Sequence, residues 1–102
     1  MTVALKLAEF LTNTPIEALP AQAMDHAAMV VASTFASAAC GTAIESAQII
    51  GALAHDAGGK PEAHVWYHHG PALPITAAAQ ANAVLSDAAA SDDSDLRNIV
   101  HA

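Results

Sequence analysis

The sequence is poor in positive charge. Among its 102 residues only Lys6, Lys60 and Arg97 are basic, against ten Asp and Glu, and the formal net charge is −7. Because proteins bind nucleic acid through clustered basic side chains that neutralise phosphates, this balance argues against a nucleic-acid partner. An anionic membrane surface is disfavoured for the same reason.

Cysteine is nearly absent, since Cys40 is the only one in the chain. A single thiol forms no disulfide within the chain, and this usage is typical of a reducing compartment. Cys40 lies at the end of a predicted helix whose other apolar residues are mostly small. This setting favours a buried structural thiol over a catalytic nucleophile.

No stretch has the pattern of a secretory leader or a membrane span. The apolar segment "VALKLAEFL" near the start is interrupted by Lys6 and Glu9 and follows no basic region, unlike a signal peptide. The uncharged run over residues 27–44 approaches the length of a span, but its Ala, Ser, Thr, Cys and Gly content favours a buried core helix. We therefore expect a cytoplasmic protein with no membrane partner.

Alanine dominates what is present. It makes up roughly a quarter of the chain, while hydrophobic residues reach 54% and aromatic residues only 4%. Alanine favours helices and lets helix backbones approach closely. It also buries little apolar area, and burial stabilises a fold by only about 25 cal/mol per Å². We expect one small, marginally stable domain that depends on a partner chain or on a further part of a parent protein.

The spacing of apolar residues predicts an all-α fold, a bundle of four to five helices. The predicted helices cover residues 2–12, 20–40, 43–57 and 74–90. A capping box in "TPIE", with Thr14 as N-cap and Glu17 reaching back, predicts a further helical turn. Gly41 and Gly58 are expected to end the second and third helices. The one short extended segment is the aromatic stretch "EAHVWYHHG" at residues 62–70.

Each helix has a face that is expected to point to the core. The predicted core positions are Val3, Leu7, Phe10 and Leu11 in the first helix, Met24, Ala28, Val31, Phe35 and Ala38 in the second, Ile44, Gln48, Ile49, Ala52 and Leu53 in the third, and Ala78, Ala81, Leu85 and Ala88 in the last.

Two segments have some features of metal sites. His64, His68 and His69 are spaced to supply two zinc ligands, but Cys40 is the only thiol and nothing completes a set of four. The stretch "DDSD" at residues 92–95 opens like a calcium loop, yet the glycine and the twelfth-position Glu are absent. We therefore predict no metal and no cofactor. A free-standing metal-binding bundle that uses His64, His68 and the aspartates remains an alternative.

Four motifs, in their order, resemble the N-terminal part of the MmgE/PrpD family, which includes 2-methylcitrate dehydratase, cis-aconitate decarboxylase and iminodisuccinate epimerase. The motifs are "LAEFL" near the start, the small-residue helix ending in "ACGT", "GGKPEAHVWYHHGPALPITAAAQANAV", and "DDSDLRNIVHA". The family pattern G-x-x-L-P-x-x-x-A-A matches residues 70–79, and the family's Asn-Gly pair falls on Asn82 and Ala83.

The last motif carries the expected site. The family's paired aspartates fall on Asp92 and Asp93, its threonine on Ser94, and its I-V-H on Ile99, Val100 and His101. This sequence also departs from the motif. A leading aspartate that helps bind or activate substrate in the decarboxylase branch falls on Ala90, and two family histidines fall on Asp87 and Asp95. An epimerase, a dehydratase-like branch or a member whose function has drifted fits these departures equally well.

The resemblance implies a lyase or isomerase that removes a proton next to a carboxylate of a small di- or tricarboxylate substrate. His101 would act as base or donor, Ser94 would hydrogen-bond the substrate, Asp93 would orient His101, and Asp92 would take part in substrate binding. Family enzymes are much longer and draw lysines and histidines from later segments. We therefore expect residues 1–102 to be a single helical domain, an N-terminal fragment that is inactive alone.

The alternative is a non-catalytic dimerisation or association module. Its small-residue helix faces, especially over residues 20–40 and 74–90, would pack against a second copy or against the remainder of the parent chain. The resemblance also implies a homodimer, so this role is compatible with the enzymatic one.

Overall fold

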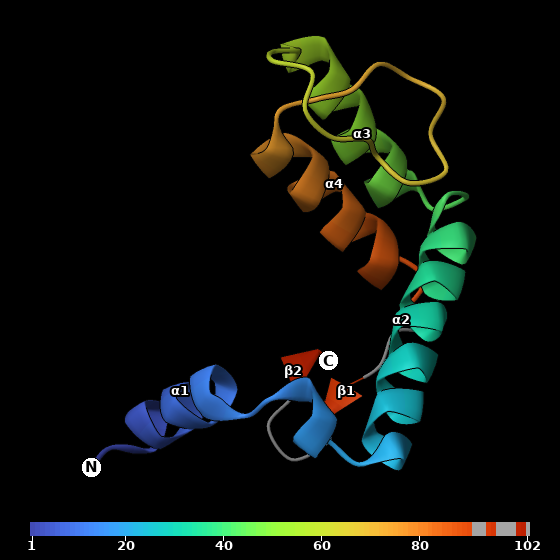
Figure 1. The fold of residues 1–102 in the computed structure, drawn as a ribbon. Coiled ribbons are helices and arrows are strands. Elements are labelled where there is room, and N and C mark those ends of the chain that lie inside the picture. Colours follow the sequence, from blue (N-terminus) through green and yellow to red (C-terminus); the bar gives the residue numbers. More distant parts are fainter. Residues whose placement is uncertain (91–93, 96–99, 102) are drawn as a thin grey trace.

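The computed structural model describes residues 1–90, 94–95 and 100–101. The elements in chain order are α1 (Val3–Asn13), the 3-10 turn η1 (Ile16–Ala18), α2 (Ala21–Gly41), α3 (Glu45–Ala57), α4 (Ile75–Asp87), β1 (Ser94–Asp95) and β2 (Val100–His101) (Figure 1). The predicted all-α fold is confirmed, and the two strands form one short antiparallel pair.

The predicted capping box at "TPIE" is wrong. The backbone N–H of Thr14 donates to the Phe10 carbonyl, 3.0 Å away, so Thr14 caps the C-terminus of α1. The next turn, η1, begins one residue later than predicted, after Pro15, and its N-terminus has no side-chain cap. Glu17 is therefore at the second position of a three-residue turn, and a capping box requires it at the third.

The C-terminal end of α2 packs tightly against α4. A Cβ added to Gly41 would collide with the backbone carbonyl of Leu85, so only glycine permits this approach of the two helices. One turn earlier, the buried Ser37 hydroxyl donates to the Ser86 carbonyl over 2.6 Å. Gly41 is thus the last residue of α2, where the sequence predicted the first residue after it, and it serves packing more than helix termination.

The core is small and centred on α4. One buried cluster contains Val65, Leu73, Ala78 and Ala81, and a second contains Ala38, Ala47 and Leu85. The predicted inner face of α4 is confirmed, because Ala78, Ala81 and Leu85 are buried and Ala88 packs against the second cluster. Most of these side chains are methyl groups, so the core buries little apolar area per residue.

The predicted core faces of α1 and α2 are largely exposed. No residue of α1 is buried, and Val3, Leu7, Phe10 and Leu11 remain 56–83% exposed. In α2 only Ala38 of the predicted stripe is buried, whereas Met24, Val31 and Phe35 are 39–55% exposed. The periodicity identifies an apolar face correctly but does not identify what covers it.

The predicted inner side of α3 is wrong. Ile44, Ile49 and Leu53 are exposed, and the buried residues of the helix are Ala47 and Gly51. Because α3 is apolar on several sides, its periodicity does not define one face. The face with the smallest side chains allows the closest contact with α4, and that contact determines which residues are buried.

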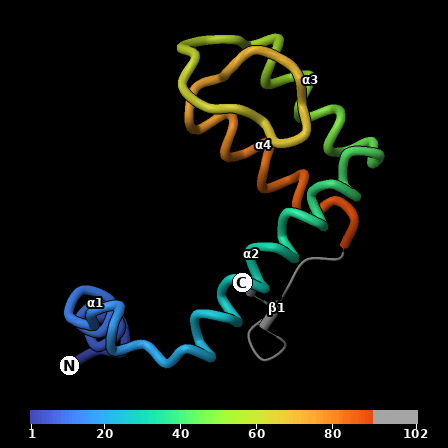
Figure 2. The backbone as a smooth tube through the Cα atoms, turned by 45° about the vertical axis from the view of Figure 1, so that its right-hand side comes forward, coloured from blue at the N-terminus to red at the C-terminus, as the bar shows by residue number. Residues whose placement is uncertain are grey.

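The helices form two parts: a lobe, made of α3, α4, residues 58–74 and the C-terminal half of α2, and an arm, made of α1, η1 and the N-terminal half of α2. In Figures 1 and 2, α3, α4 and the connecting segment 58–74 cluster at one end with the C-terminal half of α2, while α1 and η1 lie at the other end. The Cα radius of gyration is 16.6 Å, against about 13 Å for a compact domain of this length. The arm therefore leaves α1 and the first half of α2 without a packing partner among the described residues.

None of the helices in the described part of the chain is long and apolar enough to cross a membrane by itself. The helices α2 and α3 meet that length and composition only as a pair, and the pair is bent by 89° at its break.

Candidate functional site

Ser94 and His101, the two central residues of the expected site, are brought opposite each other by the backbone. The strands β1 and β2 are antiparallel, with Ser94 paired to His101 and Asp95 paired to Val100. The two residues are seven positions apart in the sequence, and the hairpin brings their backbones together.

The remaining residues of the expected site, Asp92 and Asp93, lie outside the described residues. Arg97, the one arginine of the chain, also lies outside them. Calcium binding at residues 92–95, which the sequence argued against, depends on the same segment.

The chain leaves α4 through a left-handed residue. Ala90 has a φ of 50°, and its N–H donates to the Asp87 carbonyl over 2.8 Å. A non-glycine residue in this region carries a strain of about 1–2 kcal/mol. This turn follows the end of α4 and precedes, in the sequence, the segment that contains Ser94 and His101.

Asn82 anchors the aromatic segment to the middle of α4. Its Oδ1 accepts from the Trp66 N–H at 2.8 Å, and its Nδ2 donates to the His64 carbonyl at 3.2 Å. A single bridge, Ala63 to Leu73, closes the base of the same segment. The predicted extended segment is therefore mainly a loop, and the Asn82 side chain supplies the hydrogen bonds that a strand partner would otherwise supply.

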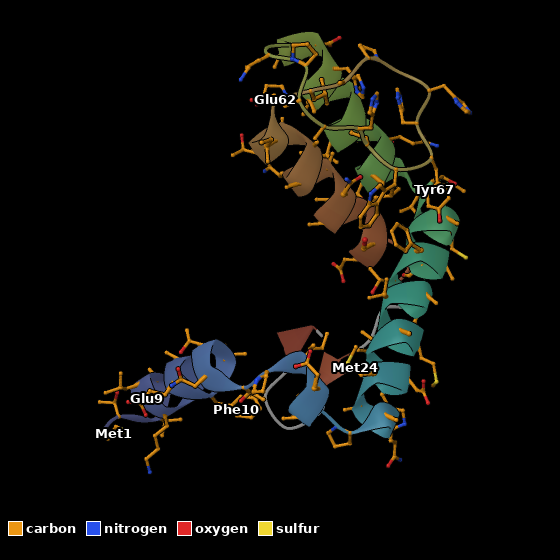
Figure 3. All side chains as sticks on the ribbon, in the orientation of Figure 1. Met1, Glu9, Phe10, Met24, Glu62 and Tyr67 are labelled. Atoms are coloured by element: carbon orange, nitrogen blue, oxygen red, sulfur yellow. The ribbon has the colours of Figure 1, made fainter. Side chains whose placement is uncertain are left out.

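The aromatic residues of this loop attach it to α2. The Tyr67 hydroxyl donates to the Phe35 carbonyl over 2.9 Å, and the Trp66 ring lies 4.6 Å from the Phe35 ring, centroid to centroid. Figure 3 shows Tyr67 where the loop meets the C-terminal end of α2. Tyr67 adopts a φ of 59°, which this double attachment to α2 holds in place.

His55 and His68 stack, a contact that the sequence analysis did not identify. Their ring centroids are 4.3 Å apart and the ring planes differ by 27°. The His55 Nδ1 is 2.8 Å from the Gly51 carbonyl and must donate to it, because a carbonyl only accepts. His68 Nδ1 accepts the Gly70 N–H at 2.9 Å. Each ring therefore has one nitrogen committed to the backbone, and His55 Nε2 is buried with no hydrogen-bond partner among the described residues.

The same stack accounts for Gly70. A Cβ at this position would lie 2.7 Å from His55 Nε2 and 2.7 Å from two atoms of the His68 ring. The helical spacing of His55 behind Gly51 was visible in the sequence, but nothing in the sequence indicated that a residue 13 positions later would stack on it.

No three His, Cys, Asp or Glu side chains gather to hold a metal ion within the described ranges. His68 is engaged by His55 and by Gly70, while the His64 carbonyl accepts a hydrogen bond from Asn82. The alternative metal site based on His64 and His68 therefore finds no third ligand in that part of the molecule.

The prediction of a buried thiol is wrong, because Cys40 is free and exposed. The small residues beside it, Ala38 and Gly41, face α4, whereas Cys40 lies on the opposite side of the last turn of α2. Its position at the end of an apolar helix was therefore a poor guide to burial.

Positive charge is scarce among the residues that the structure describes. Lys60 forms an ion pair with Glu62 at 2.7 Å, and the lysine side chain is 79% exposed. An exposed pair of this kind contributes at most about 1 kcal/mol. Lys6 lies on α1, away from the lobe (Figure 1). The described residues thus provide no cluster of cations for a carboxylate substrate.

A model of a known protein family matches this chain over residues 5–102, and its description is the MmgE/PrpD N-terminal domain. The chain belongs to the MmgE/PrpD family. The match covers nearly the whole sequence and includes the segment with Ser94 and His101. No curated protein and no solved structure gives a significant match.

Two positions that the MmgE/PrpD resemblance singled out, Asn82 and Ala90, have structural roles in and just after α4. The resemblance put the family's Asn-Gly pair on Asn82, and in this MmgE/PrpD domain that side chain holds the loop against α4. It put the family's leading aspartate on Ala90, which is the left-handed residue after α4. Aspartate adopts this backbone region more readily than alanine.

Proposed function

We propose that this MmgE/PrpD domain forms one wall of the active site of a lyase or isomerase that acts on a small di- or tricarboxylate. The observation that carries this proposal is the register of β1 and β2, which sets Ser94 opposite His101. With a hydroxyl and an imidazole at neighbouring positions, the hydroxyl can bind a substrate carboxylate while the imidazole accepts a proton from the adjacent carbon.

In this proposal His101 is the general base. Its imidazole accepts the proton from the carbon next to a substrate carboxylate, which a histidine can do near neutral pH. Ser94 donates a hydrogen bond to that carboxylate, Asp93 orients the imidazole, and Asp92 contributes to the substrate-binding surface.

The branch of the family decides the second half of the reaction. Loss of hydroxide from the neighbouring carbon, protonated to water as it leaves, gives dehydration. Return of a proton to the opposite face gives epimerisation. In the decarboxylase branch no proton is removed first: the bond between the carbon and its carboxylate breaks, CO₂ leaves, and the electron pair left behind takes a proton, which a protonated His101 would donate.

Binding of an anionic substrate requires positive charge that residues 1–102 do not supply in sufficient number. The chain has a net charge of −7, and like charges near a polyanionic substrate oppose its binding. Stabilisation of a developing anion requires positioned donors or cations. We propose that lysines or arginines of the remainder of the parent chain, or of a second subunit, complete the site, and that residues 1–102 alone are inactive.

The test is exchange of the substrate C–H proton with deuterated water, followed by NMR for a panel of di- and tricarboxylates. The enzyme is the natural polypeptide that contains residues 1–102. His101→Ala should lower the exchange rate by at least about 100-fold, the usual contribution of a general base. His64→Ala, at an exposed histidine whose backbone alone is used by Asn82, should stay within about twofold.

Two results would contradict the proposal. Unchanged exchange in the His101→Ala enzyme excludes His101 as the base. Turnover by the purified 102-residue chain excludes the requirement for outside cations.

A second role, association, is favoured by the exposed apolar arm. Large apolar side chains that are at least one-third exposed gather in α1, η1 and α2, including Leu7, Phe10, Leu11, Ile16, Met24, Met29 and Val31. Contiguous exposed apolar surface is typical of an interaction site. We propose that a second copy or the remainder of the parent chain covers this arm. Two results together would exclude this association role. Light scattering would show a strict monomer at high concentration, and the arm would also be exposed in the full parent chain.

A further inference from the structure

We propose that the cavity between α3, α4 and the aromatic loop binds a small neutral molecule about the size of a single ring, bearing one amide or hydroxyl group. The cavity has a volume of about 250 Å³. An apolar cavity of about 150 Å³ is sufficient to hold benzene. The described residues that line it come from α3, α4, the loop and the end of α2, whereas β1 and β2 lie toward the other end of α2 (Figure 1), so we treat it as separate from the proposed carboxylate chemistry.

The floor of the cavity is apolar and comes from three elements. Ala47 and Gly51 belong to α3, Val65 to the loop, and Ala81 and Leu85 to α4. All five are otherwise buried in the fold. A planar apolar ligand would therefore contact surfaces that the core already holds rigid, so little ordering is required on binding.

Gly51 is the residue that keeps the cavity open. A glycine inside a helix is less stable than alanine, so its presence calls for a structural reason. At Gly41 the reason is the Leu85 carbonyl, which leaves no room for a Cβ. At Gly51 a Cβ would meet nothing within 4 Å, and the backbone is helical. Among the described residues nothing requires glycine here except the open space itself.

Among the polar side chains of the lining, which also include Thr42, Trp66 and Tyr67, His68 and Gln48 supply one donor and one acceptor. His68 Nδ1 accepts the Gly70 N–H, so a neutral ring carries its proton on Nε2 and can donate to a ligand. Gln48 Nε2 donates to the Thr42 carbonyl at 3.1 Å, which leaves Oε1 as an acceptor. An amide or a hydroxyl can use both groups.

The charge of the lining selects a neutral ligand. None of the described side chains that line the cavity is an Asp, Glu, Lys or Arg. An ionised ligand would lose hydration there without an opposite charge to compensate. This feature also distinguishes the cavity from the proposed carboxylate site.

The experiment is an NMR titration of the ¹⁵N-labelled 102-residue chain with benzamide as the probe. We expect saturable amide shifts confined to residues 47–52, 65–68 and 81–85, with a Kd on the order of 1 mM for a ligand of this size. Gly51→Leu, which fills the space, should weaken binding at least about tenfold. Ser46→Leu places the same side chain at an exposed position of the same helix and should leave binding unchanged.

The outcomes separate clearly. Shifts that do not saturate, that spread over other residues, or that persist in Gly51→Leu overturn the proposal. Shifts of the same amides on dilution of the chain without benzamide also overturn it, because they indicate that a second copy occupies the cavity. If Gly51→Leu lacks a dispersed spectrum, Gly51→Ala decides the question, with about threefold weakening expected and no weakening counting against the site.

Discussion

Gly41 and Leu85 approach so closely that no side chain fits between α2 and the α4 backbone. The Cα of Gly41 faces the Leu85 carbonyl, and a Cβ would overlap the carbonyl oxygen. Gly41→Ala should therefore lower the free energy of unfolding by about 1–3 kcal/mol, as overpacking against backbone does, although alanine is the better helix former. Chemical denaturation followed by circular dichroism measures the change.

Gly51→Ala is the matched substitution on α3. It makes the same chemical change in a helix where a Cβ has no neighbour within 4 Å. We expect the free energy of unfolding to rise by about 0.5–1 kcal/mol. A loss of stability in the same denaturation assay would show that the space over Gly51 is not free.

Asn82→Ala should destabilise the lobe. It removes the acceptor for the Trp66 N–H and the donor for the His64 carbonyl, at about 1–3 kcal/mol for groups left unpaired. Hydrogen exchange of the Trp66 amide should accelerate at the same time. Gln80→Ala, at an exposed position of the same helix, should change neither quantity. Equal protection of the Trp66 amide in both variants would contradict the role of Asn82.

Ala90→Gly should stabilise the turn after α4. Ala90 has a φ of 50°, and glycine removes a strain of about 1 kcal/mol or more there. Ala90→Asp, which restores the family residue, should stabilise by a smaller amount because aspartate tolerates this region. Ala89→Gly, next to it but without positive φ, should lower the thermal midpoint instead. A thermal midpoint below that of the unmodified chain for Ala90→Gly contradicts the assignment.

Cys40 should react with a thiol reagent in the folded chain. Its residue is exposed and the thiol is free, so denaturant should accelerate the reaction only a few-fold. A buried thiol, which the sequence favoured, would instead react mainly through unfolding and much more slowly. The rate measured by absorbance with and without denaturant distinguishes the two.

The helices were predictable because their signals are local. Pro20 and the Gly58-Gly59 pair mark helix ends near those that the structure shows. The inner face of α4 was also predictable, since Ala78, Ala81 and Leu85 repeat at helical spacing. The order of the family motifs also predicted the family correctly, whereas the roles of Ser94 and His101 stay a prediction.

Which side chains are buried, exposed or stacked on one another was decided by contacts among the helices and the loop. The sequence alone determined the helices and their approximate limits, because helix propensity and helix-end signals act within a few residues of one another. It also determined the family, because the order of the motifs can be read along the chain without any knowledge of contacts. Only the tertiary structure decided that α3 turns Ala47 and Gly51 inward, that Cys40 faces out, and that His55 stacks on His68. These outcomes depend on which helix faces can approach most closely. In an alanine-rich chain several faces are similarly apolar, so small differences in side-chain size select among them.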